Sequence, residues 1–461
     1  MKQVDILFSI LTLPEVLLLR YVGSEFHKKG YKIGFILFHE AGEDLLEGYP
    51  FLIFNIHKIK KDFKLREKSV EELEKEYGIL NFRELLIREK ISYNRKDEKK
   101  LENKASLYLQ ILDDVFQQTH PRCVVQELGD FVANKCVYYA ARKNNIDHIF
   151  YEPAPFKQRI VFTLNSYYAD IPDELLNKEV NPEVKKRVEE YVNEYLQKGE
   201  IVIPFKDKFS FGDATIRKFL NFEYLKRLKR KIIHKYFQKK EEEYSEIGWV
   251  IRCSVLKWFR RKILTPYYFE PKKKEKYIFF PLHVPFDIQI TTRSKLFYNQ
   301  IGFLEYLSRI IPFGYKLYIK EHPAAVGGYS FWGLRNLLKE HNNVKLIHPR
   351  VSSYHLIKNA ELIISVNSKV GFEALMQNKK VVVVGDALYK NKGITFDVDN
   401  INNLERVVKK ALESSDPNFD RILKFLYAVY EGSYPTELFL IEEENLKNSF
   451  RSFYDFIHIV L

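Results

Sequence analysis

The sequence predicts an α/β protein with two Rossmann-like, doubly wound domains that face a cleft. Its 461 residues are about three times the length of a typical domain, so two cores are expected. Short apolar segments, which suit parallel strands buried on both faces, alternate with helical segments. We expect a first Rossmann-like domain over 1–205, a basic, mostly helical insertion or linker over 206–272, a second Rossmann-like domain over 273–401 and C-terminal helices over 402–461.

The first domain opens with a β-α-β unit and then repeats it. Apolar residues 3–10 and 31–38 predict two parallel strands around a helix at 14–30. Residues 58–105 are rich in Lys and Glu with sparse apolar positions, so we expect exposed helices that lead into a helix ending near Gln118. The second unit has a strand at 123–126, a helix through Arg142 and a strand at 147–152.

The second domain shows the same alternation of strands and helices. We expect strands at 276–282, 316–320, 344–347, 361–366 and 380–384, with helices near 297–310, 330–340, 352–358 and 370–378. Residues from about 402 onward are predicted to be helical, and the last helix is a candidate to pack back on the first domain.

The composition indicates a cytoplasmic protein that is soluble or peripheral at the inner membrane. Cys123, Cys136 and Cys253 lack the spacing of a metal site and fit a reducing compartment. The first residues carry an acid within a short apolar run and no cleavage site, so they predict a strand and not a signal peptide. No segment approaches the roughly 18 apolar residues of a membrane span. No metal site is predicted.

The positive charge is concentrated in one segment. The net charge is +13, and residues 206–276 hold 21 Lys and Arg against nine Asp and Glu. Within this segment, Thr215 to Lys240 has the pattern of a basic amphipathic helix. Its apolar face either contacts an anionic membrane or packs on the protein while the bases are solvated, and the sequence leaves both open. No nucleic-acid partner is expected, because no RNA- or DNA-binding motif accompanies the charge.

A phosphate site is predicted where the strand at 361–366 turns into a helix. The polar and small residues of this turn are Ser365, Asn367, Ser368 and Gly371. Backbone N–H groups at a helix start lack partners and the helix dipole is positive there, so an anion is favoured. Gly371 would allow close backbone approach. Ser368 is also suited to cap the helix, and the following loop at 385–389 either closes over the base or sugar or is only a connection.

Two further groups accompany this turn. Glu373 either binds ribose hydroxyls or is an acid favoured by the helix dipole. Lys320, His322 and Pro323 end another strand, and the proline fixes His322 in an extended turn from which it could bind a phosphate or protonate a leaving group. Lys320 adds a cation on the same face as His322. Open parallel sheets bind ligands beyond the carboxyl ends of their strands, so both clusters predict one nucleotide-sized ligand.

Carboxylates that could act on a sugar follow other strands. Asp287, in the loop after the strand at 276–282, is a candidate nucleophile or base at an anomeric carbon, or a cap for the helix that starts near Ile288. Glu127 is the candidate general acid or base of the first domain, because desolvation at a strand end raises the pKa of a carboxyl group. Asp130 is better suited to cap the next helix. The candidates for the acceptor side are Glu40, Asp130 and Glu152.

These motifs resemble the capsule polysaccharide synthesis family, which includes bacterial β-Kdo transferases that use CMP-Kdo. The similarity rests on residues 280–287, 320–323, 365–375 and 383–389, in that order. It covers about 277–395, is thin around 123–155 and is not seen elsewhere, the basic segment included. The resemblance implies the GT-B plan of two Rossmann-like domains facing a cleft, with CMP bound by the C-terminal domain.

The resemblance also implies roles for individual residues. His322, Ser365 and Ser368 would contact the nucleotide phosphate. Asp287 would form a covalent sugar–enzyme adduct in a retaining double displacement, with Glu127 as acid/base. The family usually has Gln where this chain has His283.

The implied partners are a nucleotide sugar such as CMP-Kdo and a glycan or glycolipid acceptor of capsule or lipopolysaccharide synthesis. No cofactor is required, because a CMP-sugar carries less negative charge than a nucleoside diphosphate sugar. Two alternatives remain open: a transferase that uses a nucleoside diphosphate hexose, and a non-catalytic capsule-assembly protein that keeps the fold.

Overall fold

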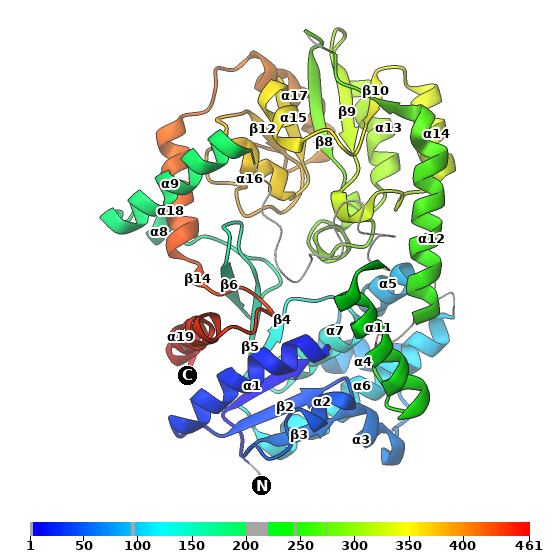
Figure 1. Ribbon diagram of the computed structural model, residues 1–461, viewed down its shortest axis with the longest axis vertical. Coiled ribbons are helices and arrows are strands. Elements are labelled where there is room, and N and C mark those ends of the chain that lie inside the picture. The colour runs from blue at the N-terminus through cyan, green and yellow to red at the C-terminus, as the bar shows by residue number, and fades with distance from the viewer. Residues whose placement is uncertain (1–2, 94–96, 200–219, 244–246, 273) are drawn as a thin grey trace.

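The molecule is built on two seven-stranded sheets, as the computed structural model shows (Figure 1). The structure describes residues 3–93, 97–199, 220–243, 247–272 and 274–461. Both sheets are mostly parallel and are covered by helices. The predicted α/β fold with two Rossmann-like domains, the GT-B class, is confirmed.

The first sheet has the strand order β14-β6-β5-β4-β1-β2-β3. Its strands are β1 (Ile6–Ile10), β2 (Ile33–Leu37), β3 (Leu52–Asn55), β4 (Cys123–Glu127), β5 (Asp147–Pro153), β6 (Arg159–Leu164) and β14 (Tyr434–Pro435). The strands from β3 to β5 pair in parallel, while β6 and β14 extend the sheet in antiparallel pairing. Every residue of β1 and β2 is buried, because both faces of the sheet are covered.

Helices form a layer on each face of this sheet. One layer contains α1 (Leu13–Lys28) and α19 (Glu443–Val460), with the short α2 (Ala41–Asp44) beside α1. The other contains α3 (Ile56–Asp62), α4 (Val70–Tyr77), α5 (Phe82–Ser92), α6 (Glu98–Thr119) and α7 (Val132–Lys143). The expectation of exposed helices over 58–105 is wrong. Leu73, Leu85 and Leu101 are buried in this layer, because a few apolar residues on one stripe suffice to bury a helix face among Lys and Glu.

The second sheet has the order β13-β12-β11-β8-β9-β10-β7 and pairs in parallel throughout. Its strands are β7 (Tyr268–Phe269), β8 (Tyr277–Pro281), β9 (Lys316–Lys320), β10 (Val344–Ile347), β11 (Leu362–Ser365), β12 (Val381–Val383) and β13 (Phe396–Asp397). The predicted strands are all present. The two-residue edge strands β7 and β13 were not predicted, because two residues show no periodicity.

Five helices and several short turns complete the second domain. The helices are α13 (Gln300–Ile310), α14 (Phe331–Glu340), α15 (Ser353–Asn359), α16 (Lys369–Met376) and α17 (Leu404–Glu413). The short turns are the π-helix η5 (Gln289–Arg293) and the 3₁₀ turns η6 (Lys295–Phe297), η7 (Pro323–Ala325) and η8 (Ile401–Asn403).

Two segments pack on the domain that is distant from them in sequence. After β6 come α8 (Asp173–Asn177) and α9 (Pro182–Lys198), and the Tyr354 hydroxyl donates to the Leu196 carbonyl of α9 at 2.7 Å. The apolar face of α9 thereby joins the core of the second domain. After α18 (Phe419–Glu431), β14 and α19 return to the first sheet and to α1. Domain membership therefore departs from the predicted division at 205 and 402.

The basic segment forms helices at the side of the molecule. It contains α11 (Phe222–Ile232), η3 (Ile233–Phe237), α12 (Ile247–Leu264) and η4 (Thr265–Tyr267). Residues 206–219, including the predicted helix start at Thr215, lie outside the described residues. No residue of α11 is buried, and Phe222 is 80% exposed. Among the described helices, none combines the length and the apolar character needed to cross a bilayer.

Candidate functional site

The turn between β11 and α16 is shaped by hydroxyl groups. The Oγ atom of Ser365 is buried, accepts the Ser368 N–H at 3.0 Å and lies 2.8 Å from the Tyr389 hydroxyl. Tyr389 in turn donates to the Ser368 carbonyl at 2.8 Å. The Ser368 hydroxyl accepts the Val370 N–H at 3.2 Å, so Ser368 caps α16. These bonds build the turn that presents the start of α16.

Gly371 is needed because Tyr389 lies against it. A Cβ atom at position 371 would overlap the Tyr389 hydroxyl, which is buried beneath the turn. The Tyr389 hydroxyl therefore occupies the space that a side chain at position 371 would need. Tyr389 also ties the loop at 385–389 to this turn through Ser365 and Ser368.

Asn367 connects the turn to η5. Its Nδ2 atom donates to the Gln289 carbonyl at 2.9 Å and to the Ser294 Oγ at 3.2 Å. The Asp386 N–H also donates to the Ser294 Oγ, at 3.0 Å. The residues at the start of α16 and the segment after Asp287 thus form one hydrogen-bonded unit.

Lys320 and Glu373 lie in a buried charge cluster beside this turn. Lys320 is 5% exposed, and its Nζ donates to the Ser353 Oγ at 2.9 Å. Burial lowers the pKa of Lys320 to about 8, although the charge of Glu373 opposes the shift. Burial also raises the pKa of Glu373 to about 7, and the charges of Lys369 and Lys320 oppose this. Glu373 is thus a buried group, unlike the surface acid of a first helical turn.

His322 caps η7 through one nitrogen of its imidazole ring. Its Nδ1 accepts the Ala324 N–H at 3.2 Å, so the neutral ring carries its proton on Nε2. Burial lowers the pKa of His322; Asp287 opposes the shift and Lys320 reinforces it. Pro323 is the first residue of η7, and His322 has the extended backbone that was predicted. Glu321 is buried, where it accepts the Tyr268 hydroxyl at 2.9 Å.

Asp287 shares an electrostatic cluster with two histidines, His283 and His322. Burial lowers the pKa of His283 to about 4, Asp287 opposes this shift and His322 adds to it. The Nε2 atom of His283 is buried and has no hydrogen-bond partner among the described residues. The Asp287 Oδ1 accepts the N–H of Gln289, the first residue of η5, at 3.0 Å. The sequence singled out His283 only as a departure from the family, and the structure brings it into the site.

The segment after Asp287 is clamped to the first domain through Asp130 and Glu152. The hydroxyls of Thr291 and Thr292 donate to the buried Asp130 Oδ2, the second at 3.3 Å. The Arg293 guanidinium donates twice to the Glu152 carboxylate, at 3.1 and 2.5 Å. The expectation that Asp130 caps α7 is wrong, because its carboxylate bonds across the domain boundary. Both carboxylates are therefore hydrogen-bonded to residues of the second domain.

Glu127 lies at the end of β4 near a second, buried carboxyl group on α1. Glu15 accepts the Thr12 hydroxyl at 2.6 Å and the Thr12 N–H at 3.0 Å, and so forms a capping box at the start of α1. Burial raises the pKa of Glu15 to about 8, and the negative charge of Glu127 adds to the shift. Glu15 and Glu127 therefore interact electrostatically at this sheet edge. Glu15 was not predicted, because a Glu in a first helical turn is common.

Glu40 is placed elsewhere, under the basic segment. Its carboxylate accepts the Glu241 N–H at 2.8 Å and the Lys61 ammonium at 3.1 Å. The neighbouring His39 forms a β-bridge with Glu242. Glu40 therefore holds the segment around 241 on the first domain, which leaves its oxygens engaged.

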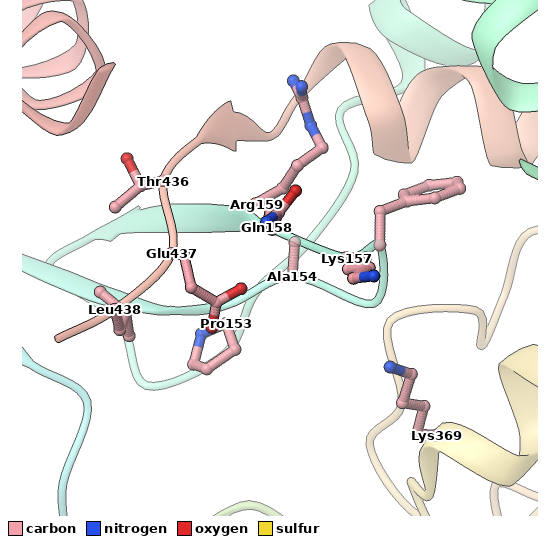
Figure 2. Close-up of a pocket in the computed structure, with 10 residues that line it drawn as sticks. Pro153, Ala154, Lys157, Gln158, Arg159, Lys369, Thr436, Glu437 and Leu438 are labelled. Carbon is pink, nitrogen blue, oxygen red and sulfur yellow. The ribbon is translucent and has the colours of Figure 1, made fainter. Parts of the chain in front are cut away.

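A small cavity of about 20 Å³ lies between the domains, next to the start of α16 (Figure 2). Lys369 lines it from α16. The turn between β5 and β6 and the residues after β14 line it from the first domain, with Pro153, Lys157 and Glu437 among them. Burial lowers the pKa of Lys369, and the charges of Glu373 and Glu437 oppose this. The predicted cleft thus has a basic residue at the start of α16.

Comparison with known proteins identifies a family for the central part of the chain. Residues 214–431 match the family described as capsule polysaccharide biosynthesis protein. The match covers somewhat less than half of the chain. The match begins at 214 and therefore includes most of the basic segment, so the expectation that the resemblance stops near 277 is wrong.

Two curated proteins are similar to parts of the chain. Protein FixF of Sinorhizobium fredii is 27% identical over 212 residues, which are 44% of this chain and 49% of FixF. The capsule polysaccharide export protein KpsS of Escherichia coli is 29% identical over 135 residues, which are 26% of this chain and 33% of KpsS. The similarity thus spans half or less of each relative.

Among solved structures, the chain is similar to KpsC of Thermosulfurimonas dismutans, described as a beta Kdo 2,7 transferase. That similarity has a TM-score of 0.41 and 14% identity, and it covers 76% of this chain and 90% of that chain. The MnaA–UDP structure of S. aureus is similar with a TM-score of 0.29 and 13% identity, over 100% of this chain and 98% of that chain.

Proposed function

We propose that the protein is a glycosyltransferase of capsule or lipopolysaccharide synthesis. In this proposal it transfers Kdo, or a related ulosonic acid, from a CMP-activated donor to a glycan or glycolipid acceptor. The observation that carries the proposal is the cluster of Asp287, His283 and His322 at the strand ends of the family-matched domain. A carboxylate beside a phosphate-binding imidazole is what displacement of a sugar from a nucleotide phosphate requires.

The donor phosphate would be bound at one edge of the second sheet. The His322 Nδ1 caps η7, so the neutral ring carries its proton on Nε2, which would donate to a phosphate oxygen. The start of α16 adds backbone N–H groups and the positive end of the helix dipole. A CMP-linked ulosonic acid carries two negative charges, on its phosphodiester and on its carboxylate. Lys320, and Lys369 at the interdomain cavity, supply cations for them.

The chemical step would use carboxylates from both domains. Asp287 would attack the anomeric carbon and form an ester bond, while CMP leaves with the electron pair of the broken bond. The acceptor hydroxyl would then displace Asp287 from the sugar, and Glu127 would take the hydroxyl proton. Two inversions at one carbon give overall retention. No step of this scheme needs a metal or another cofactor.

Nucleotide binding tests the donor assignment. A ligand that binds only the native state stabilises it by about 2.7 kcal/mol at a concentration of 100 times Kd, so CMP is expected to raise the melting temperature and UDP and GDP are not. His322→Ala should lose the CMP response, while the exposed control His355→Ala keeps it. A response to UDP or GDP alone would favour a nucleoside diphosphate hexose donor. No response to any nucleotide would favour the non-catalytic alternative.

A further inference from the structure

The helix α12 carries apolar and basic residues and no acid. Its 18 residues include five Lys and Arg, namely Arg252, Lys257, Arg260, Arg261 and Lys262, and no Asp or Glu. Large apolar side chains nevertheless remain in solvent, with Val255 at 56%, Trp258 at 45% and Phe259 at 54% exposed. A cluster of exposed large apolar side chains indicates a surface that has a partner.

One face of α12 is fixed to the protein. The Trp249 Nε1 donates to the Ser92 carbonyl of α5 at 2.7 Å, and Ser254 and Leu264 are buried. A Cβ atom at Gly327 would overlap the Lys257 carbonyl, so the backbones of α12 and the loop before α14 are in close contact. The helix is therefore held in place by its inner face, and its outer face is left to solvent.

The outer face of α12 has an apolar centre with bases around it. Ile251, Val255, Trp258 and Phe259 follow helical spacing along it, with Arg252 and Lys262 on the same side. The ammonium group of Lys262 lies 6.0 Å from the Trp258 ring centroid. Long bases beside an indole suit the interface of a bilayer, where stems and rings are apolar while charged ends reach the headgroups.

The neighbouring helix α14 continues this face. Trp332 is 65% exposed and, with Phe331, faces α12 across a groove of about 420 Å³ whose other wall includes Leu256, Phe259 and Ile263. The guanidinium of Arg335 lies 5.4 Å from the Trp332 ring centroid, so a base again flanks an exposed indole. In Figure 1, α11 lies on the same side of the view, and it has five Lys and Arg against one Glu, with Phe222 also exposed.

We propose that the outer face of α12, together with Trp332 of α14, docks on the surface of an anionic lipid bilayer. The positive charge of this face favours an anionic bilayer over a second copy of the chain as the partner. A second copy of the chain would place the same bases against one another, which repels. An anionic bilayer offers acidic headgroups to the bases and an apolar layer to the indole and phenyl rings. This inference does not depend on the donor or on the reaction.

The test is co-sedimentation of the full chain with vesicles. Binding is expected to vesicles of equal parts phosphatidylcholine and phosphatidylglycerol, and not to phosphatidylcholine alone. It should weaken as salt rises, because salt screens the attraction between bases and headgroups. The double variant Trp258→Ser, Phe259→Ser should partition at least about tenfold less, because it loses two large apolar contacts with the bilayer.

Matched variants separate docking from folding. The double variant should keep the wild-type melting temperature, since both side chains are exposed. Phe313→Ser removes an aromatic side chain that is fully exposed in the loop before β9, and it should bind vesicles as the wild type does. A charge variant, Arg252→Glu with Lys262→Glu, should lose binding to anionic vesicles.

The proposal is overturned if the wild-type chain stays in the supernatant with anionic vesicles, or if the double variant binds as the wild type does. A concentration-dependent dimer that the double variant loses would also overturn it, because the face would then belong to a second copy. Failure to bind CMP with intact vesicle binding would contradict the proposed function alone.

Discussion

The contact between Glu152 and Arg293 offers the sharpest test of how the domains are joined. Glu152→Gln removes the charge and one acceptor of an ion pair whose arginine side chain is 8% exposed. Removing one partner of a buried pair costs about 3–5 kcal/mol. In this variant Arg293 still donates hydrogen bonds to the Tyr167 carbonyl at 2.6 Å and to the Gln289 Oε1 at 3.3 Å. These bonds offset part of the lost stability. We expect the free energy of unfolding to fall by about 2–3 kcal/mol.

The assay is urea unfolding followed by circular dichroism, with a double-mutant cycle. Arg293→Met, Glu152→Gln and their combination should show a coupling energy of about 1–3 kcal/mol. The control is Glu443→Gln, which breaks an exposed pair with Lys447 at 2.6 Å and should leave the free energy of unfolding close to that of the wild type. Asp287 precedes η5, so Glu152→Gln should also reduce sugar transfer. A coupling energy near zero would refute the claim that this contact joins the domains.

Three further predictions concern single residues. Burial and the charge of Glu127 raise the pKa of Glu15 from its ordinary value of 4.5 to about 8. Between these two pH values the folded state keeps a proton on Glu15 that the unfolded state has released, so the free energy of unfolding falls as the pH rises from 4.5 to about 8. In urea titrations, the free energy of unfolding of Glu15→Gln should fall by about 2 kcal/mol less than that of the wild type between pH 5 and 7. Parallel plots of the free energy of unfolding against pH for the variant and the wild type would contradict this. Gly371→Ala should lower the free energy of unfolding by about 2–4 kcal/mol, because Tyr389 must move and lose its hydrogen bonds to Ser365 and Ser368. The control Gly248→Ala should be nearly neutral, because there is open space around Gly248. Equal melting temperatures for the two variants would contradict this. Asp287→Asn should abolish sugar transfer while CMP still raises the melting temperature, and transfer at the wild-type rate would rule out Asp287 as nucleophile.

The buried parallel strands could be predicted because their pattern is local. β9 and β10 have the predicted bounds, since each is a short apolar run with a clear break on either side. β6 was missed although it has six residues, because it follows β5 in antiparallel pairing and the sequence was interpreted as parallel units. The short strand β14 was missed because its pairing partner lies far away in the chain.

The site could be predicted only in part, because local motifs identify strand ends but not what faces them. The turn at 365–371 and the end of β9 follow two strands of one parallel sheet, as predicted, with β8 between them. The sequence gives no signal that Glu152 bonds Arg293, since 141 residues separate them. Asp130 was assigned to a helix cap for the same reason: its partners Thr291 and Thr292 come from the other domain.

A mass spectrum of the protein after incubation with CMP-Kdo tests the central claim most directly. The Glu127→Gln variant is the preferred form, because it should slow the second displacement and let the adduct accumulate. The account predicts release of CMP and a mass increase of one Kdo residue on the peptide that contains Asp287. Release of CMP at a normal rate without any adduct, or an adduct that persists in Asp287→Asn, would contradict it.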